Sequence, residues 1–464
     1  MTVSPRITPL RSLPALLLLA LSGCALQPVP TSGELREQQL PVLAERGNWS
    51  AQAIAGDPQR GWLADFNDPQ LLALVQEAVG NNRDLLRAAA RIEQARAMVA
   101  VNGGELYPAI GLKGVGGKSD TQILQLAASW EVDLWGRVRA QARAADAQLA
   151  ATQADFAWAE QLVASTTARY WFGLLQYAQL ETRLQGIIAA QEKLLALTRQ
   201  RVATGISPAS DIQDVNSALL QQRDQLRQLQ LARTQLQQEF EVLLGRYPAA
   251  SLAADRSLPA LPAAPAAGLP ASLLERRPDL IAAERRVAAA FDLQQSAQAA
   301  RLPRIALTAA ITDIQSDVFL LNAAETPLKG LSGSFLAPLF TGGQLKGQAD
   351  YYTAVQKEAA IAYGSQALNA LKEVEAGLQG EAALAERARL LEARLAEQHE
   401  ALRREQVRVK VGSRDPRSVL AREQAVLAAE SELLQLRTAQ LNQRITLLLA
   451  LGGGWQGMAA TPAG

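Results

Sequence analysis

The sequence contains the stretch WEVDLWGRVRAQ at positions 130–141 and a related stretch, FLAPLFTGGQLKGQ, at positions 335–348. Later glycines repeat at a spacing of 207 positions, Gly205 with Gly412 and Gly245 with Gly452. A period this long is not that of a short-repeat solenoid. The chain is therefore expected to contain two copies of one large unit, each mixing strands with very long helices.

The overall composition excludes several classes of protein. The 464 residues include 46 basic and 45 acidic ones, so the charges nearly cancel. That balance provides no broad positive surface for nucleic acid, and no nucleic-acid partner is expected. The low aromatic share of 5% suits long helices better than a bulky core. The single cysteine excludes an intramolecular disulfide.

The amino terminus predicts export from the cytoplasm. Two arginines precede an apolar run at 13–21, and the letters LSGC follow at 21–24. This order is typical of a secretory signal, and the run is too short to span a bilayer as a helix. The LSGC ending resembles a bacterial lipobox, which implies that Cys24 becomes the lipidated first residue. By the same resemblance, Ala25 favours delivery to the outer membrane.

Changes of pattern along the chain predict its organisation. The expected divisions are a signal peptide (1–23), a lipidated tether (24–68), repeat 1 (69–245), a linker (246–277), repeat 2 (278–452) and a tail (453–464). Alternating apolar residues predict four strands, at about 108–118, 122–134, 303–316 and 331–340. Strands of roughly 10 residues have the length that crosses a membrane.

The remaining pattern of each repeat predicts helices. Long proline-free stretches predict helices at 137–203, 211–244, 344–411 and 417–449, and a helical pattern also runs from Pro69, after the capping residue Asp68, to Gly103. In the first long helix, Leu149 and every seventh residue to Leu184 form one track, and a second track follows three positions on. This spacing is typical of a coiled coil.

Four membrane strands cannot stand alone, because their edges would leave backbone groups unpaired in hydrocarbon. The smallest closed barrels need about eight strands, so several chains must share one barrel. This reasoning leaves two, three or four chains open. The long helices, with narrow apolar seams, are expected to pack side by side into a tube. The predicted fold class is a mixed α/β membrane protein with four strands per chain in a shared transmembrane β-barrel and a long helical coiled-coil barrel.

Three motifs carry a resemblance to a known family. They are WEVDLWGR at 130–137, LERRPDL at 274–280 with AER at 283–285, and PLFTGG at 338–343. With these motifs and the lipobox, the chain resembles the TolC-like outer-membrane efflux channels, in the NodT-type lipoprotein branch. The resemblance runs from Cys24 to about Trp455.

The resemblance implies a homotrimer with a 12-stranded barrel in the outer membrane of a Gram-negative bacterium and a periplasmic helical barrel. It also implies two partners, a periplasmic adaptor protein and an inner-membrane transporter of the RND type. The expected function is a passive duct that exports small molecules such as drugs or toxic organic compounds. Two alternatives remain: the outer channel of a type I protein or peptide secretion system, and a coiled-coil spacer lipoprotein without a pore.

The family places its periplasmic entrance, normally closed, at the two helical hairpin tips. The resemblance therefore makes candidates of tip charges, with Gly205 and Gly412 as candidates for adaptor contact. The candidate gate residues are Asp211 and Asp214 in repeat 1 and Arg414, Asp415, Arg417 and Arg422 in repeat 2. Repeat 2 departs from the family pattern, because Ala421 stands where an acidic residue is usual and Arg417 where a hydrophobic one is usual. The alternative is that these are ordinary solvated charges at helix ends.

No catalytic chemistry is expected, and no enzyme activity, metal or cofactor is predicted. His399 is the only histidine and is expected to be solvated or interhelical. Gly117-Lys118-Ser119 lacks the spacing and the following helix of a phosphate-binding loop. Trp130 and Trp135 fit an aromatic girdle at the membrane interface. The segment at 276–279 is expected to anchor a helix start, with Pro278 in the first turn.

Overall fold

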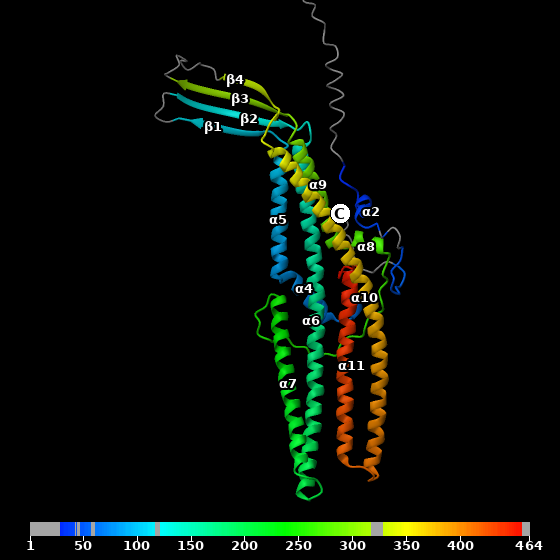
Figure 1. The fold of residues 1–464 in the computed structure, drawn as a ribbon. Coiled ribbons are helices and arrows are strands. Elements are labelled where there is room, and N and C mark those ends of the chain that lie inside the picture. Colours follow the sequence, from blue (N-terminus) through cyan, green and yellow to red (C-terminus); the bar gives the residue numbers. More distant parts are fainter. Residues whose placement is uncertain are drawn as a thin grey trace, which may run out of the picture. The chain divides into compact units, whose positions relative to one another are not determined.

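The computed structural model describes residues 28–41, 43, 47–56, 61–116, 121–316 and 328–456 (Figure 1). The signal segment, Cys24 and residues 117–120 therefore lie outside the described residues. The chain falls into two compact units. Unit 1 takes Met1–Pro41, Ala90–Gln153 and Ala282–Ser365, and unit 2 takes Val42–Ala89, Ala154–Ile281 and Gln366–Gly464.

Unit 1 contains one antiparallel sheet with the order β1-β2-β3-β4. The strands are β1 (Ala109–Val115), β2 (Thr121–Val132), β3 (Arg304–Ser316) and β4 (Leu328–Leu336). β4 starts and ends earlier than the predicted 331–340. Its end precedes Pro338, which has no N–H to donate to a neighbouring strand. The prediction of two strands from each copy in one structure is confirmed.

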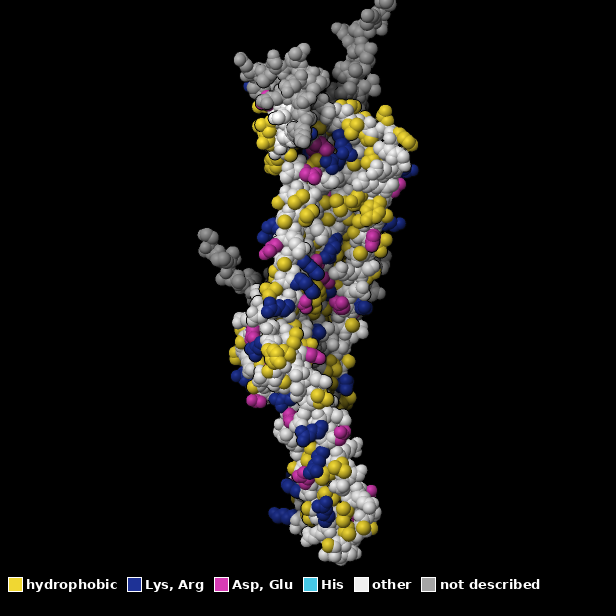
Figure 2. Space-filling model, turned by 90° about the vertical axis from the view of Figure 1, so that its left-hand side faces the viewer, with side chains coloured by type: hydrophobic (Ala, Val, Ile, Leu, Met, Phe, Trp, Pro, Cys, Tyr) yellow, Lys and Arg dark blue, Asp and Glu magenta, His cyan; other side chains and the backbone are white. Residues whose placement is uncertain are grey.

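The register of the sheet separates its side chains into two different faces. Leu112 lies opposite Leu126, which in turn lies opposite Ile311. The same face carries exposed apolar side chains from all four strands: Ile110, Leu112, Leu124, Leu126, Trp130, Leu307, Ile311, Leu331 and Phe335. The opposite face carries mainly small or polar residues: Lys113, Gln125, Ser129, Thr308, Thr312, Ser332 and Ser334. The separation is not complete, because Val115 and Ile123 lie on this second face and Asp313 and Lys329 on the apolar one. Figure 2 shows yellow hydrophobic side chains beside the grey atoms at the upper end of the view, the end at which Figure 1 draws the strands.

Two indole groups hold the chain near the strand ends. Trp135 donates to the carbonyl of Pro303 at 2.6 Å, and Trp130 donates to the carbonyl of Leu106 at 3.1 Å. Unit 1 also contains an ion pair between the half-exposed Arg143 and the buried Asp292, in which Arg143 donates to Asp292 at 2.7 Å. Burial raises the pKa of Asp292 more than this arginine lowers it. The half-buried Trp135 joins two segments of unit 1 through its hydrogen bond to Pro303, which is separate from the girdle at the membrane interface expected from the sequence.

The long helices form two hairpins. α6 (Arg137–Ala203) pairs with α7 (Ser210–Leu243), and α10 (Gln344–Lys410) pairs with α11 (Pro416–Ala450) (Figure 1). The first and third of these helices have 67 residues each. Among the described residues, no helix combines the length and the apolar character that crossing a membrane requires.

Shorter elements complete the fold: α2 (Ser32–Gln39), η1 (Ala64–Phe66), α4 (Pro69–Asn81), α5 (Arg83–Gly104), α8 (Pro270–Arg276) and α9 (Pro278–Ala299). The single helical pattern predicted from Pro69 to Gly103 is wrong, because the chain is extended at Asn82. The Asn82 side chain accepts hydrogen bonds from the N–H groups of Asp84 and Leu85 and so caps α5. Asp68 caps α4 in the same way.

The main core of unit 2 surrounds the middle of α6. Its largest members are Trp62, Trp171 and Phe172. The most buried α6 residues, which include Ala164, Ala168 and Leu175, lie off both heptad tracks. The tracks predicted a helix with a single seam, whereas α4, α7, α11 and a loop contribute to this core. α6 is therefore buried on more than one face here, which a two-stranded coiled-coil pattern does not predict.

The segment before α4 is tied to the linker between the repeats. Trp49 donates to the carbonyl of Gly268 at 2.9 Å, and Ile54 forms a parallel bridge with Ala266. The Glu375 carboxylate accepts the N–H groups of Ser50 and Ala51. These bonds hold an extended segment of unit 2 that has no helix or sheet of its own.

Candidate functional site: the hairpin tips

Both hairpins turn through the same backbone motif. The Gly205 N–H bonds to the carbonyl of Val202 and the Ile206 N–H to that of Arg201. In repeat 2, the Gly412 N–H bonds to Val409 and the Ser413 N–H to Arg408. These are Schellman endings, in which the glycine takes a positive φ of 72° and 76° respectively. Nothing lies within 4 Å of a Cβ added at either glycine, so the backbone angle alone requires them.

The second helix of each hairpin starts differently. Asp415 caps α11 by accepting the Arg417 N–H at 2.9 Å, and Pro416 occupies the first turn. α7 has Ala209 at the capping position and no side-chain cap, although Asp211 lies in its first turn. A negative charge there interacts favourably with the helix dipole.

The tips of the two hairpins are joined by ion pairs within unit 2. Arg201 Nη1 of α6 lies 3.0 Å from Asp415 Oδ2. Arg417 Nη1 lies 3.8 Å from Asp211 Oδ2, and its Nε lies 3.0 Å from Asp415. Arg417 thus lies between a carboxylate of each repeat. The result is a chain of four charges that runs from one hairpin to the other.

This arrangement keeps Asp415 ionised. Burial tends to raise the pKa of Asp415, but bonds from the Arg417 N–H and guanidinium, together with the charges of Arg417 and Arg201, lower it below its usual range. A lowered pKa means that the contribution to stability is present at neutral pH and is lost as pH falls through the folded-state pKa. The link between the hairpins therefore persists at neutral pH.

A second cluster belongs to repeat 2 alone. Glu405 of α10 is buried, with Arg408 Nη1 at 3.6 Å and Arg414 Nε at 3.9 Å. Its pKa is lowered by a hydrogen bond from Ser418 and by the charges of Arg414, Arg408 and Arg422. Arg414 and Arg422 thus lie near a carboxylate of their own hairpin. Asp214 is exposed and forms no ion pair with another described residue, and Ala421 is exposed as well.

Sequence reasoning missed two members of these networks, Arg201 and Glu405. Arg201 stands at the start of the repeated stretch RVATG, whose counterpart in repeat 2 begins with Arg408. Both arginines contact acidic residues of the tip region. The repeated arginine was therefore an available signal.

Further polar links join the hairpins above the tips. Gln424 of α11 donates to Gln191 of α6, and Arg183 lies 3.6 Å from Glu430. Glu430 also lies 3.8 Å from His399 of α10. The only histidine thus lies between the two helices of its own hairpin. The described residues contain no group of three His, Cys, Asp or Glu side chains that could hold a metal ion.

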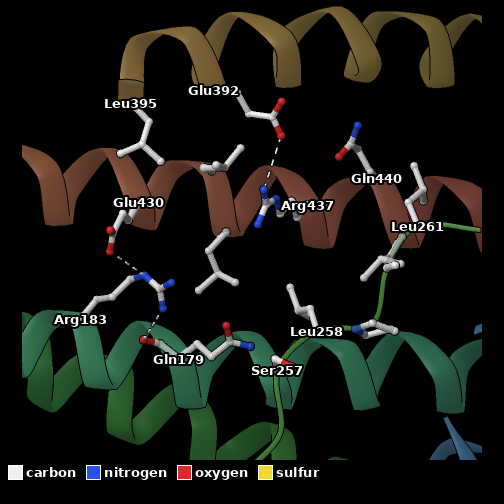
Figure 3. Close-up of a pocket in the computed structure, with 15 residues that line it drawn as sticks. Gln179, Arg183, Ser257, Leu258, Leu261, Glu392, Leu395, Glu430, Arg437 and Gln440 are labelled. Atoms are coloured by element: carbon white, nitrogen blue, oxygen red, sulfur yellow. Dashed lines mark hydrogen bonds and ion pairs between the residues drawn. The ribbon is translucent and has the colours of Figure 1, made fainter. Parts of the chain in front are cut away.

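The contact of Arg183 with Glu430 borders a cavity of about 680 Å³ between α6, α10, α11 and the linker (Figure 3). Arg183 points to Glu430 and Gln179, and Arg437 points to Glu392. Leu258 and Leu261 of the linker supply an apolar wall. Each of these two ion pairs joins one positive and one negative side chain, so the cavity lining carries no net charge.

The segment at 276–279 forms a buried anchor within unit 2. Arg277 donates twice to Asp279, at 3.0 and 2.8 Å, and once to Glu373 at 2.6 Å. It also reaches the carbonyl of Ala450 at 3.4 Å and lies 4.9 Å from the ring of Trp158. Pro278 begins α9 directly after this arginine. The anchor holds the start of α9 against the end of α11.

A sheet with one exposed apolar face, two strands from each repeat, and paired helical hairpins joined at charged tips are the features of channel-forming outer-membrane proteins. The chain belongs to the outer membrane efflux protein family, whose model matches residues 74–246 and 269–453. The predicted resemblance to TolC-like efflux channels is confirmed.

Individual relatives match nearly the whole chain. The pyoverdine export outer membrane protein OpmQ of Pseudomonas aeruginosa is 30% identical, over 94% of this chain and 95% of its own length. The cation efflux system protein CusC of Escherichia coli K12 is 28% identical, over 97% of this chain and 100% of its own. The solved outer-membrane channel OprN is 26% identical, with a TM-score of 0.79 over 89% of this chain and 98% of its own. The mixed fold class is thereby confirmed, and the chain is an outer-membrane efflux channel.

Proposed function

We propose that this chain is the subunit of a passive, trimeric outer-membrane duct that exports small molecules. The energy would come from an inner-membrane transporter of the RND type, coupled through a periplasmic adaptor. OpmQ is named for pyoverdine export and CusC for cation efflux, and both names support a small cargo rather than a protein. The cargo of this chain is proposed only as that class.

One observation carries the proposal, namely the two-faced sheet with two free edges. Its apolar face suits lipid and its polar face suits water. β1 and β4 are the outer strands of the order β1-β2-β3-β4, so each has one edge without a partner in the described chain. In a membrane such edges must be paired. If β4 of one copy pairs with β1 of the next, the strand count is four per copy, and three copies would close a barrel of 12.

The hairpins support the same assembly. α6 and α11 contact each other through Arg183 and Glu430, which leaves α7 and α10 as the outer helices (Figure 1). Both outer helices keep exposed apolar side chains: Leu220, Leu231 and Val242 on α7, and Leu368, Leu390 and Val407 on α10. Pairing α7 of one copy with α10 of the next would bury these side chains and extend a continuous helical wall.

The ion pairs at the tips are proposed to hold the entrance closed. Opening would separate the hairpins and break the contacts of Arg201 with Asp415 and of Arg417 with Asp211. Half-exposed pairs of this kind are individually worth about 1 kcal/mol or less. A partner protein could therefore open the entrance at modest cost by acting on several such pairs at once. Gly205 and Gly412 remain the proposed points of adaptor contact.

Lipidation of Cys24 is proposed as an additional anchor. Mass spectrometry of the mature protein is expected to find an acylated cysteine at its amino terminus. Cleavage at another position would remove this part of the proposal and leave the duct untouched.

The main test is conductance of the purified full chain in planar bilayers, together with a mass measurement of the detergent-extracted protein. We expect three chains and a mostly closed channel. Asp415→Asn is expected to raise the open fraction, because asparagine keeps the helix cap but loses the charge. Asp214→Asn is the matched control, since Asp214 is exposed and forms no ion pair with another described residue. A folded monomer, or a chain that never conducts in any variant, would overturn the proposal.

A further inference from the structure

The two tips differ strongly in charge although they occupy equivalent places in the duplication. Residues 400–423 of hairpin 2 include seven basic and four acidic residues, a formal charge of +3. The equivalent residues of hairpin 1, 193–216, include three basic and two acidic ones, a formal charge of +1. A chain that is nearly neutral as a whole thus concentrates positive charge at one tip.

The difference is larger at the surface. Of the seven cations at tip 2, six are exposed: Arg403, Arg404, Arg408, Lys410, Arg414 and Arg422. None of its four acidic residues is exposed. Tip 1 exposes two cations, Lys193 and Arg199, and one anion, Asp214. All the exposed charges that a partner meets at tip 2 are therefore positive.

The ion pairs within tip 2 leave part of its positive charge uncompensated. Arg403 and Arg404 share the single carboxylate of Glu400, at 2.7 and 2.8 Å. Arg408, Arg414 and Arg422 share the buried Glu405. Arg404 and Arg408 are also spaced four apart on one helix, where like charges destabilise slightly. The arrangement has a small cost in the isolated chain, which an acidic partner surface would offset.

We propose that tip 2 is the electrostatic docking surface for a periplasmic partner protein whose contacting end is acidic. This inference rests on the proposed function, in which an adaptor meets the tips. It assigns to hairpin 2 the electrostatic attraction that speeds the adaptor's approach. The cations on α10 extend from Arg403 to Lys410, seven residues or about 10 Å along the helix. Salt screens the attraction between exposed charges beyond a Debye length of about 8 Å at physiological salt, so the partner must present its own charges close to the patch.

The test measures adaptor binding to the full chain in lipid nanodiscs. The probe is the purified periplasmic adaptor of the same organism that binds the wild-type chain most tightly, titrated from low to high salt. The triple variant R403Q/R404Q/K410Q removes three exposed charges that take no part in the proposed gate. We expect its association rate to fall about tenfold or more at low salt, with a flatter dependence on salt.

Two variants serve as controls. K193Q/R199Q removes the exposed positive charges of tip 1 and is expected to change the association rate less than about twofold, far less than the triple variant of tip 2. R403K/R404K keeps the charge of tip 2 and is expected to bind like the wild type. Loss of binding in this Lys variant would indicate a structural role of the arginines and would contradict the proposal.

The remaining outcomes separate this inference from the proposed function. Unchanged binding and salt dependence in the triple variant overturn the docking surface while the duct stands. A wild-type channel that conducts but binds no adaptor overturns the docking surface as well, and leaves the pore in place. A change in the number of chains per particle in the triple variant would assign the patch to contacts between copies, and would also overturn it.

Discussion

In each repeat, a side chain from outside the hairpin binds the last carbonyl of the hairpin's second helix, but the two repeats use different chemistry. In repeat 1, the Asn82 amide donates to the carbonyl of Leu243 at 3.1 Å. In repeat 2, the Arg277 guanidinium reaches the carbonyl of Ala450, which is 207 positions after Leu243. Both side chains directly precede helices of 22 residues, α5 and α9. Duplication has thus preserved the contact and exchanged the residue that makes it.

A carbonyl at a helix end, which has no hydrogen-bond partner within its own helix, is thus bound here in two different ways. The neutral amide of Asn82 needs only an acceptor for its NH2 group and donors for its oxygen. A buried guanidinium needs carboxylates, and Asp279 and Glu373 supply them. Replacing one partner of a buried charged group leaves the other uncompensated, whereas removing a neutral partner is less costly. Repeat 2 should therefore be the more sensitive joint.

The largest expected effect is at these joints. Arg277→Met is expected to lower the free energy of unfolding by about 3–5 kcal/mol, because Asp279 would remain buried and unpaired. Asn82→Ala should lower it by about 1–2 kcal/mol through loss of the α5 cap and of the bond to Leu243. Urea unfolding followed by circular dichroism, at one detergent and one protein concentration, measures both.

The double variant R277M/D279N sharpens this test. Removal of both charged partners should recover part of the loss, since no unpaired carboxylate remains at Asp279. Equal losses in Arg277→Met and Asn82→Ala would show that the guanidinium network contributes no more than a simple amide, and would contradict the comparison.

The next effect compares the base and the tip of hairpin 1. Gly245 and Gly205 have nearly the same positive φ, 76° and 72°. A Cβ at Gly245 would lie 2.9 Å from the backbone oxygen of Asn81, whereas nothing lies within 4 Å at Gly205. Gly205→Ala should cost about 1 kcal/mol from the backbone angle alone. Gly245→Ala should cost about 3 kcal/mol, because the backbone before α5 must also shift.

The same unfolding measurement distinguishes strain from close contact. Similar losses in the two glycine variants would mean that the joint at Asn81 relaxes freely. The base of the hairpin would then tolerate an added methyl group as well as its exposed tip does.

The repeats also differ in how the chain leaves each hairpin. The buried Glu241 carboxylate accepts N–H groups of Ala250, Ser251 and Leu252, whereas the equivalent position in repeat 2 is Leu448. Burial tends to raise the pKa of Glu241, but the bonds from Ser251, Ala250 and Leu252 outweigh it and lower the pKa. The contribution to stability is therefore present at neutral pH and is lost as pH falls through the folded-state pKa.

Glu241→Gln is accordingly expected to lower the free energy of unfolding by about 2 kcal/mol at neutral pH. The difference from the wild type should shrink as pH falls through the lowered folded-state pKa of Glu241, where the wild-type carboxylate becomes protonated. Unfolding titrations at several pH values check this. A difference that stays constant down to the lowest pH would mean that the charge of Glu241 contributes nothing.

Periodicity and duplication were sufficient to predict the class of fold. The 207-residue spacing predicted two equivalent hairpins, and glycines at Gly205 and Gly412 predicted their turns. Alternation with a period of two predicted the strands because each strand has one apolar and one polar face. The break at Asn82 was not predicted, since asparagine in a helical pattern gives no clear stop signal and its capping role depends on the folded neighbour Leu243.

The candidate site was predictable only in part. The family pattern directed attention to charges such as Asp211 and Arg417, which the structure brings within 3.8 Å. The pairing of Arg201 with Asp415 joins residues far apart in sequence, and no local pattern specifies it. The partners of Arg277 pose the same problem, because Glu373 is 96 positions away. Whether the tip charges form the gate remains a prediction for conductance measurements.

The smallest expected effect tests how closely the two hairpins pack. Gly173 and Gly380 are equivalent by the 207-residue spacing, and each faces the equivalent residue of its partner helix. A Cβ at Gly173 would lie 2.9 Å from Leu236, and one at Gly380 would lie 2.7 Å from the Gln443 amide. In both cases the obstacle is the end of a side chain rather than backbone. An alanine also gains about 1 kcal/mol in helix propensity over glycine, which offsets part of any clash.

The two substitutions should nevertheless differ. Leu236 packs against the main core of unit 2, so its side chain has little room to move, and Gly173→Ala is expected to cost about 1 kcal/mol net. Gln443 is half-buried and can rotate away at the loss of one hydrogen bond to Gly377, worth about 1 kcal/mol, so Gly380→Ala should be nearly neutral. Parallel urea titrations of the two variants decide the matter. A larger loss at Gly380 than at Gly173 would mean that the polar contact of repeat 2, and not the apolar contact of repeat 1, sets the spacing of the paired helices.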